Sequence, residues 1–123
     1  MNIAVAGGTG IVGRHVVRIA RERGHQVTSL TRREGVDLVK GTGLAAALKG
    51  VETLIDVASI QTMHTKKSVD FFMATTENLH REGKAAGVKH HVLLSIVGAD
   101  KAPAGYYAGK MAQEEEVRGG DIP

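Results

Sequence analysis

The chain contains no cysteine and no tryptophan, and proline, tyrosine and phenylalanine occur only twice each. Without cysteine it has no disulfide, no thiolate metal ligand and no thiol nucleophile, a composition that suits a reducing compartment. Its six histidines are not grouped with carboxylates at ligand spacing, so we assign no metal site. The first residues do not resemble a signal peptide, and no apolar run is long enough to cross a bilayer. We therefore expect a cytoplasmic protein with no membrane partner.

The 123 residues are enough for one domain with a single core, and they carry a formal net charge of +3. Abundant glycine, 16 residues, together with few aromatics is typical of a layered α/β sheet built from Val, Ile, Leu and Ala. Several arginines follow the first apolar run, where they fall on the polar face of a predicted helix. No aromatic residues are interleaved with these arginines, so we expect no nucleic-acid partner.

Residues 3–17 are the most informative part of the sequence. A short apolar run leads into Gly7, Gly10 and Gly13, which are spaced three apart, and an amphipathic helix comes next. In a parallel α/β sheet such a turn holds a dinucleotide. The first glycine permits the tight exit from the strand, the second lets the backbone approach a pyrophosphate, and the third lets the helix pack closely on the sheet. The alternative is a plain structural turn between a strand and a helix.

The rest of the sequence alternates between short β-type runs and amphipathic segments. We expect strands at 2–6, 26–30, 36–39, 53–58 and 91–95, and helices at 11–23, 44–48 and 106–118, with a further helix from an N-cap at Ser68 to Gly87. This alternation predicts an α/β fold, a doubly wound parallel sheet (Rossmann fold) in three layers, with about five strands in the order 3-2-1-4-5. We expect residues 1–123 to form one NAD(P)-binding domain. Residues 118–123 read as a helix end before another strand, so we expect a C-terminal substrate-binding part to be lacking.

The end of the second predicted strand bears on the choice of cofactor. In NAD-preferring folds an Asp or Glu near this point accepts hydrogen bonds from the ribose hydroxyls. This chain instead has Thr31, Arg32 and Arg33, and a guanidinium group matches a 2′-phosphate. We therefore predict NADP, with NAD as the alternative cofactor, and we take Arg32 as the first candidate and Arg33 as the second. The alternative is that both arginines are solvated loop residues.

A Tyr-x-x-x-Lys pair, Tyr106 and Lys110, comes after the last predicted strand, and this spacing places both side chains on one face of a helix. A nearby ammonium lowers the pKa of a phenol and so makes it a better acid–base group at neutral pH. We predict Tyr106 as a proton donor, Lys110 as its activator and Ser95 as the residue that orients a substrate carbonyl. Asp56 lies within a predicted strand, where a buried acid needs a partner, and we expect it to be structural.

Together these segments resemble the short-chain dehydrogenase/reductase superfamily, and in particular its atypical NmrA-like branch. The resemblance rests on Ala-Gly-Gly-Thr-Gly-Ile-Val-Gly, Thr-Arg-Arg, Asp-Val-Ala-Ser, Leu-Leu-Ser-Ile-Val-Gly-Ala-Asp and Tyr-Tyr-Ala-Gly-Lys. It implies that the pyrophosphate is lined by Gly7, Thr9, Gly10, Ile11 and Gly13, that Arg32 faces the 2′-phosphate, that Ala58 and Ser59 flank the middle of the cofactor, and that Lys110 reaches the nicotinamide ribose. The chain departs from the pattern at residues 41–43, Gly-Thr-Gly, where relatives have Gly-Asp near the adenine.

Three functions fit these residues. The first is an NADP(H)-dependent oxidoreductase that reduces a quinone or another carbonyl compound. The second is a non-catalytic dinucleotide sensor of the NmrA-like kind, and the third is a nucleotide-sugar epimerase or dehydratase. The small-molecule substrate is not readable from the sequence. An unpaired edge at the last predicted strand would permit a homo-oligomer.

Overall fold

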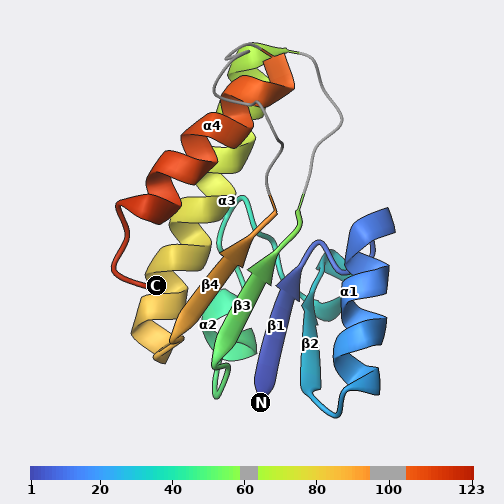
Figure 1. Ribbon diagram of the computed structural model, residues 1–123. Helices are drawn as coiled ribbons and strands as arrows, with labels where there is room; N and C mark the ends of the chain where they lie inside the picture. Colours follow the sequence, from blue (N-terminus) through green and yellow to red (C-terminus); the bar gives the residue numbers. More distant parts are fainter. Residues whose placement is uncertain (59–63, 95–104) are drawn as a thin grey trace.

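The computed structural model describes residues 1–58, 64–94 and 105–123, with side chains from Ala108 onward in the last range (Figure 1). The elements in chain order are β1 (Asn2–Ala6), α1 (Ile11–Glu22), β2 (Gln26–Leu30), the 3-10 turn η1 (Arg32–Glu34), α2 (Leu44–Ala47), β3 (Thr53–Asp56), α3 (Thr65–Ala86), β4 (His90–Leu93) and α4 (Gly105–Arg118). None of these helices is both long and apolar enough to cross a membrane, a statement that covers the described residues.

The strands form one parallel sheet in the order β2-β1-β3-β4, which confirms the predicted doubly wound α/β fold. Ala6, at the end of β1, lies level with Leu30 of β2 and with Asp56 of β3. The chain leaves β1 toward β2 on one side and returns to β3 on the other side. Between β1 and β3 the strand order therefore reverses, and in open α/β sheets ligands bind at the carboxyl ends of the strands at such a point.

The sheet lies between two helical layers, with α1 on one face and α2, α3 and α4 on the other (Figure 1). Side chains of β1 alternate between these faces, because successive residues of a strand point in opposite directions. Ile3 and Val5 pack against α1, whereas Ala4 and Ala6 pack on the α3 side. The larger core on the α3 side includes Leu30, Leu44, Leu48, Leu54, Leu79 and Ile122. The predicted three layers are thus present.

The strand predicted at 36–39 is wrong, and within the described residues the sheet has four strands. The carbonyls of Leu38 and Val39 accept hydrogen bonds from the Asn78 amide of α3, at 2.9 and 2.8 Å. The Asp37 carboxylate accepts from the backbone N–H groups of Val39 and Lys40, both at 3.0 Å. These bonds give the backbone groups of residues 38–40 partners within the loop and on α3, so the segment does not pair with β2 as a strand.

The start of α3 also differs from the prediction, and it bears on the helix pair α3 and α4. The N-cap of α3 is His64, whose Nδ1 accepts from the backbone N–H of Lys67 at 3.4 Å, and Ser68 lies buried inside the helix. A Cβ on Gly109 of α4 would lie 2.0 Å from Ser68 Oγ. Ser68 is therefore part of a close crossing between the two helices, which excludes its predicted role as the cap.

Candidate functional site

The glycine turn between β1 and α1 requires glycine at two of its three positions. Gly7 has φ +84°, and a Cβ on it would lie 2.7 Å from the backbone nitrogen of Ala58. A Cβ on Gly13 would lie 1.8 Å from the carbonyl oxygen of Gly7, so the helix can approach the turn only without a side chain. A Cβ on Gly10 would meet nothing closer than 3.4 Å. No close contact within the described part of the protein requires glycine at position 10, and the space beside its backbone suits the predicted approach of a pyrophosphate.

The start of α1 presents backbone N–H groups at this turn, because the first N–H groups of a helix have no partner within the helix. Gly10 is the N-cap and makes no side-chain capping bond, and the first turn of the helix contains no acidic residue. Ile11 is 76% exposed beside it. Free N–H groups and the positive end of the helix dipole favour an anion, and here they meet the open backbone at Gly10.

A groove of about 390 Å³ runs from this turn across the carboxyl end of β2. It is lined by Gly7, Thr9, Leu30, Thr31, Arg32, Arg33, Val36, Asp37, Leu38, Val39, Ala58 and Phe71. Five of the residues predicted to bind the cofactor, Gly7, Thr9, Arg32, Arg33 and Ala58, therefore line one surface. The volume lies within the range of small-molecule sites. The mixture of apolar side chains and two guanidinium groups suits a nucleoside that carries phosphate.

The remaining predicted residues divide into three groups. Gly10, Ile11 and Gly13 continue from the groove into the start of α1. Lys110 lies on α4, is 3% exposed and is not among the groove-lining residues. Ser59, Ser95 and the Tyr106 side chain lie outside the described residues.

Two arginines follow β2 after one intervening residue, Thr31, in a local structure that explains their placement. Thr31 is the N-cap of η1, and its hydroxyl accepts from the backbone N–H of Glu34 at 3.3 Å. This turn holds Arg32 and Arg33 at the strand end, where Thr31 stands in place of the acid typical of NAD-preferring folds. The arginines and the open groove are thus adjacent.

One acid does line the groove, and sequence reasoning missed it. The pKa of Asp37 is held below its usual value, first by the backbone N–H of Lys40 and further by that of Val39 and the charge of Arg32. Asp37 is therefore an anion at the groove wall at neutral pH. A local signal existed, because an Asp followed within four residues by Gly41 is typical of a turn.

A buried polar network lies at the carboxyl end of β3. Asp56 is fully buried, and its carboxylate accepts from the backbone N–H of Ala58 and from the Gln113 side-chain amide, both at 3.0 Å. The same amide, through Oε1, accepts from the Lys110 ammonium at 2.6 Å. Burial raises the pKa of Asp56 to about 6, and the bonds from Ala58 and Gln113 and the charge of Lys110 oppose this. The partner that the sequence required for Asp56 is thus Gln113, which the sequence did not single out.

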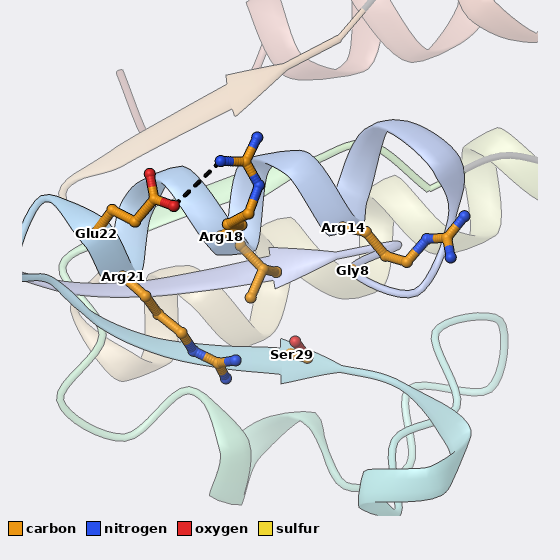
Figure 2. Close-up of a pocket in the computed structure, with 7 residues that line it drawn as sticks. Gly8, Arg14, Arg18, Arg21, Glu22 and Ser29 are labelled. Atoms are coloured by element: carbon orange, nitrogen blue, oxygen red, sulfur yellow. Dashed lines mark hydrogen bonds and ion pairs between the residues drawn. The ribbon is translucent and has the colours of Figure 1, made fainter.

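A second hollow of about 480 Å³ lies between α1 and β2 (Figure 2). Its arginines come from α1, and Figure 2 shows the guanidinium groups of Arg14, Arg18 and Arg21 pointing in different directions. Arg18 is paired with Glu22 at 3.1 Å, and both side chains are more than half exposed. This surface therefore matches the predicted solvated helix face rather than a convergent anion site. No group of three histidines and carboxylates that could hold a metal ion occurs within ranges 1–58, 64–94 and 105–123.

Sequence comparison finds curated relatives of this chain. The chain is 31% identical over 119 residues to the photosystem II assembly factor Ycf39 of Synechocystis sp., a match that covers 84% of this chain and 36% of that protein. It is 28% identical over 134 residues to ceramide reductase of Caulobacter vibrioides, covering 97% of this chain and 42% of the relative. The chain thus spans well under half the length of these two curated relatives.

Solved structures show the same fold. UDP-N-acetylglucosamine 4-epimerase from Bacillus cereus superposes with a TM-score of 0.80 at 22% identity, over 96% of this chain and 52% of that one. The NADPH-dependent quinone oxidoreductase QOR2 of Escherichia coli, complexed with NADPH, superposes with a TM-score of 0.74 at 23% identity, over 98% of this chain and 47% of that one. A model of the NAD dependent epimerase/dehydratase family matches residues 3–115. This chain therefore belongs to the NAD dependent epimerase/dehydratase family, a group of atypical short-chain dehydrogenases/reductases.

Proposed function

We propose that the protein is an NADP(H)-dependent oxidoreductase of the NmrA-like kind that reduces a quinone or another carbonyl compound. The observation that carries the cofactor choice is the shared groove of Arg32, Arg33 and the glycine turn. Two fixed positive charges beside a helix N-terminus suit a ligand with both a pyrophosphate and a 2′-phosphate. A quinone oxidoreductase of the same fold is complexed with NADPH, and one relative is named a ceramide reductase.

The residues of this chain at the glycine turn and the groove suit a bound dinucleotide. Gly10 leaves backbone open at the helix start, and Ala58 brings the end of β3 to the same groove. When bound, the nicotinamide supplies hydride to an acceptor. The chain's own part is to bind and orient: Lys110 would hold the nicotinamide ribose, Tyr106 would donate a proton to the acceptor oxygen, and Ser95 would orient that oxygen.

The cofactor preference is testable by titration. In Arg32→Ala, we expect NADPH to bind about 10 to 100 times more weakly, since a hydrogen bond to a charged group is lost, while NADH affinity changes less than about twofold. Arg118→Ala, at the exposed end of α4, is the matched control, because it removes the same charge far along the chain from the groove. Fluorescence titration of both nucleotides against all three proteins gives the answer. An equal loss for NADPH and NADH would overturn the assignment to the 2′-phosphate.

The second candidate is a dinucleotide-binding sensor without turnover, and the burial of Lys110 favours it. At 3% exposure, the ammonium lies inside the protein rather than at the surface of the groove. NADPH oxidation with a panel of quinones, in wild type and Tyr106→Phe, separates the candidates. Turnover that Tyr106→Phe lowers supports the oxidoreductase, whereas tight NADPH binding with no turnover on any acceptor supports the sensor.

A further inference from the structure

The crossing of α3 and α4 turns Lys110 toward the interior. A Cβ on Gly109 would lie 2.0 Å from Ser68 Oγ and 2.5 Å from Phe72 Cδ2, so the helices approach closely because this residue has no side chain. The next residue, Lys110, is buried at this crossing. Its Nζ lies 4.5 Å from the centroid of the Phe72 ring, a cation–π contact. A buried ammonium with one aromatic contact still needs an acceptor.

Gln113 supplies that acceptor and is itself fully buried. It lies three residues after Lys110 on the same helix, and its amide oxygen accepts from the ammonium at 2.6 Å. Its amide nitrogen donates to Asp56 at 3.0 Å. An amide can accept at one end and donate at the other, which neither a carboxylate nor an apolar side chain can do. The amide orientation is fixed by its two partners, since an ammonium offers only donors and a carboxylate only acceptors.

We propose that Gln113 is the positioning residue of Lys110: its amide holds the ammonium and ties it to Asp56, at the carboxyl end of β3, without a direct ion pair. The proposal rests on the proposed role of Lys110 in holding the nicotinamide ribose. Asp56 in turn is anchored by the backbone N–H of Ala58, at the wall of the cofactor groove. Asp56, Gln113 and Lys110 thus connect the groove wall to the buried face of α4.

The charges around Lys110 set the direction of the test. Burial lowers the pKa of Lys110, while Asp56 of β3 and Glu114 of α4 oppose that change, and α3 presents the ring of Phe72. Asp56 and Glu114 are the charged groups that shift the pKa of Lys110. Loss of the Gln113 oxygen disfavours the charged ammonium, so the pKa of Lys110 falls further. A carboxylate in the same place favours the ammonium, so the pKa rises.

The experiment uses the full-length gene product with Gln113→Met and Gln113→Glu, and with Glu115→Gln as a control on the exposed face of α4. NMR titration of the lysine side chains, with the Lys110 signal assigned by Lys110→Arg, reports its pKa without any activity. NADPH affinity is measured across the same pH range. We expect Gln113→Met to weaken NADPH about tenfold and to move the alkaline loss of affinity to lower pH. Gln113→Glu moves that loss to higher pH, and the control leaves it in place.

A merely structural role for Gln113 would weaken NADPH equally at every pH and leave the Lys110 titration where it is, and that result overturns the proposal. If Gln113→Met does not fold, Gln113→Asn takes its place, because it keeps the amide but shortens its reach. Lys110→Met isolates the proposed function: unchanged NADPH affinity in this variant removes Lys110 from cofactor binding. The NMR titration still decides whether Gln113 positions the ammonium.

Discussion

Gly13→Ala is a substitution for which helix propensity and tertiary packing predict opposite signs. Gly13 lies in the first turn of α1 and has no positive φ, so backbone conformation does not exclude a side chain. Alanine is favoured over glycine in a helix by about 1 kcal/mol. On propensity alone the variant would be more stable than wild type.

The structure predicts the opposite. The new Cβ would lie 1.8 Å from the carbonyl oxygen of Gly7 and 2.6 Å from its carbonyl carbon. To regain ordinary contact, α1 and the turn would have to separate by roughly 1.5 Å. Overpacking costs about 1–3 kcal/mol, and we take the upper end or more, because the opposing atoms are backbone and cannot rotate away. After subtracting the propensity gain, we expect a net loss of about 2 kcal/mol.

The assay is urea unfolding monitored by circular dichroism, with a thermal scan in parallel. For a domain of this size, the expected loss corresponds to a fall in Tm of roughly 8 °C. Gly83→Ala in α3 is the matched control, because its Cβ would lie 3.3 Å from the flexible end of Ile122 and at an ordinary contact distance of 3.7 Å from Val88. We expect the control to be neutral or slightly stabilising. If Gly13→Ala proves as stable as Gly83→Ala, the close approach of α1 to the glycine turn is refuted.

Two further predictions test the groove wall and the sheet edge. Asn78→Ala removes the donors that hold the carbonyls of residues 38–39, and should lower the stability of the fold by about 1–2 kcal/mol. It should also weaken NADPH binding several-fold, because the groove wall is loosened. Glu77→Ala is the control, and unchanged NADPH affinity in Asn78→Ala would contradict the assignment of this segment to the cofactor groove. Burial lowers the pKa of His91 from 6.5 to about 4, so between these values the unfolded chain takes up a proton that the folded chain does not. Stability from this group therefore falls as pH falls, by up to about 2 kcal/mol at pH 5, and His91→Phe should flatten the slope in urea unfolding at pH 7 and 5. The pKa of Asp56 is raised to about 6, so its contribution to stability increases as pH falls between about 6 and 4, opposite to that of His91. The test therefore compares the pH dependence of stability in His91→Phe with that of wild type.

Apart from the strand predicted at 36–39, the order of the strands and helices is readable from the sequence alone, and so is the nature of the glycine turn. β1 and α1 are coded within residues 2–22 by a short apolar run, spaced glycines and helical periodicity, all of which are local. The structure then shows why glycine stands at 7 and 13, by their close approaches to Ala58 and to the turn. The position of Arg32 and Arg33 beside the groove was also predictable, because only Thr31 separates them from the last residue of β2.

Tertiary structure decided the features that depend on partners distant in sequence. Residues 36–39 have the composition of a strand, but Asn78 binds the Leu38 carbonyl from 40 residues away, and the segment becomes the wall of the groove. Gln113 bonds Asp56 across a separation of 57 residues, and this contact accompanies the burial of Lys110. Local periodicity carries no information about such pairs, because hydrogen-bond partners are chosen only when the helices pack on the sheet. The sequence by itself determined a dinucleotide-type turn on a parallel sheet, and only the packing of α3 and α4 determined how the groove wall and the lysine are held.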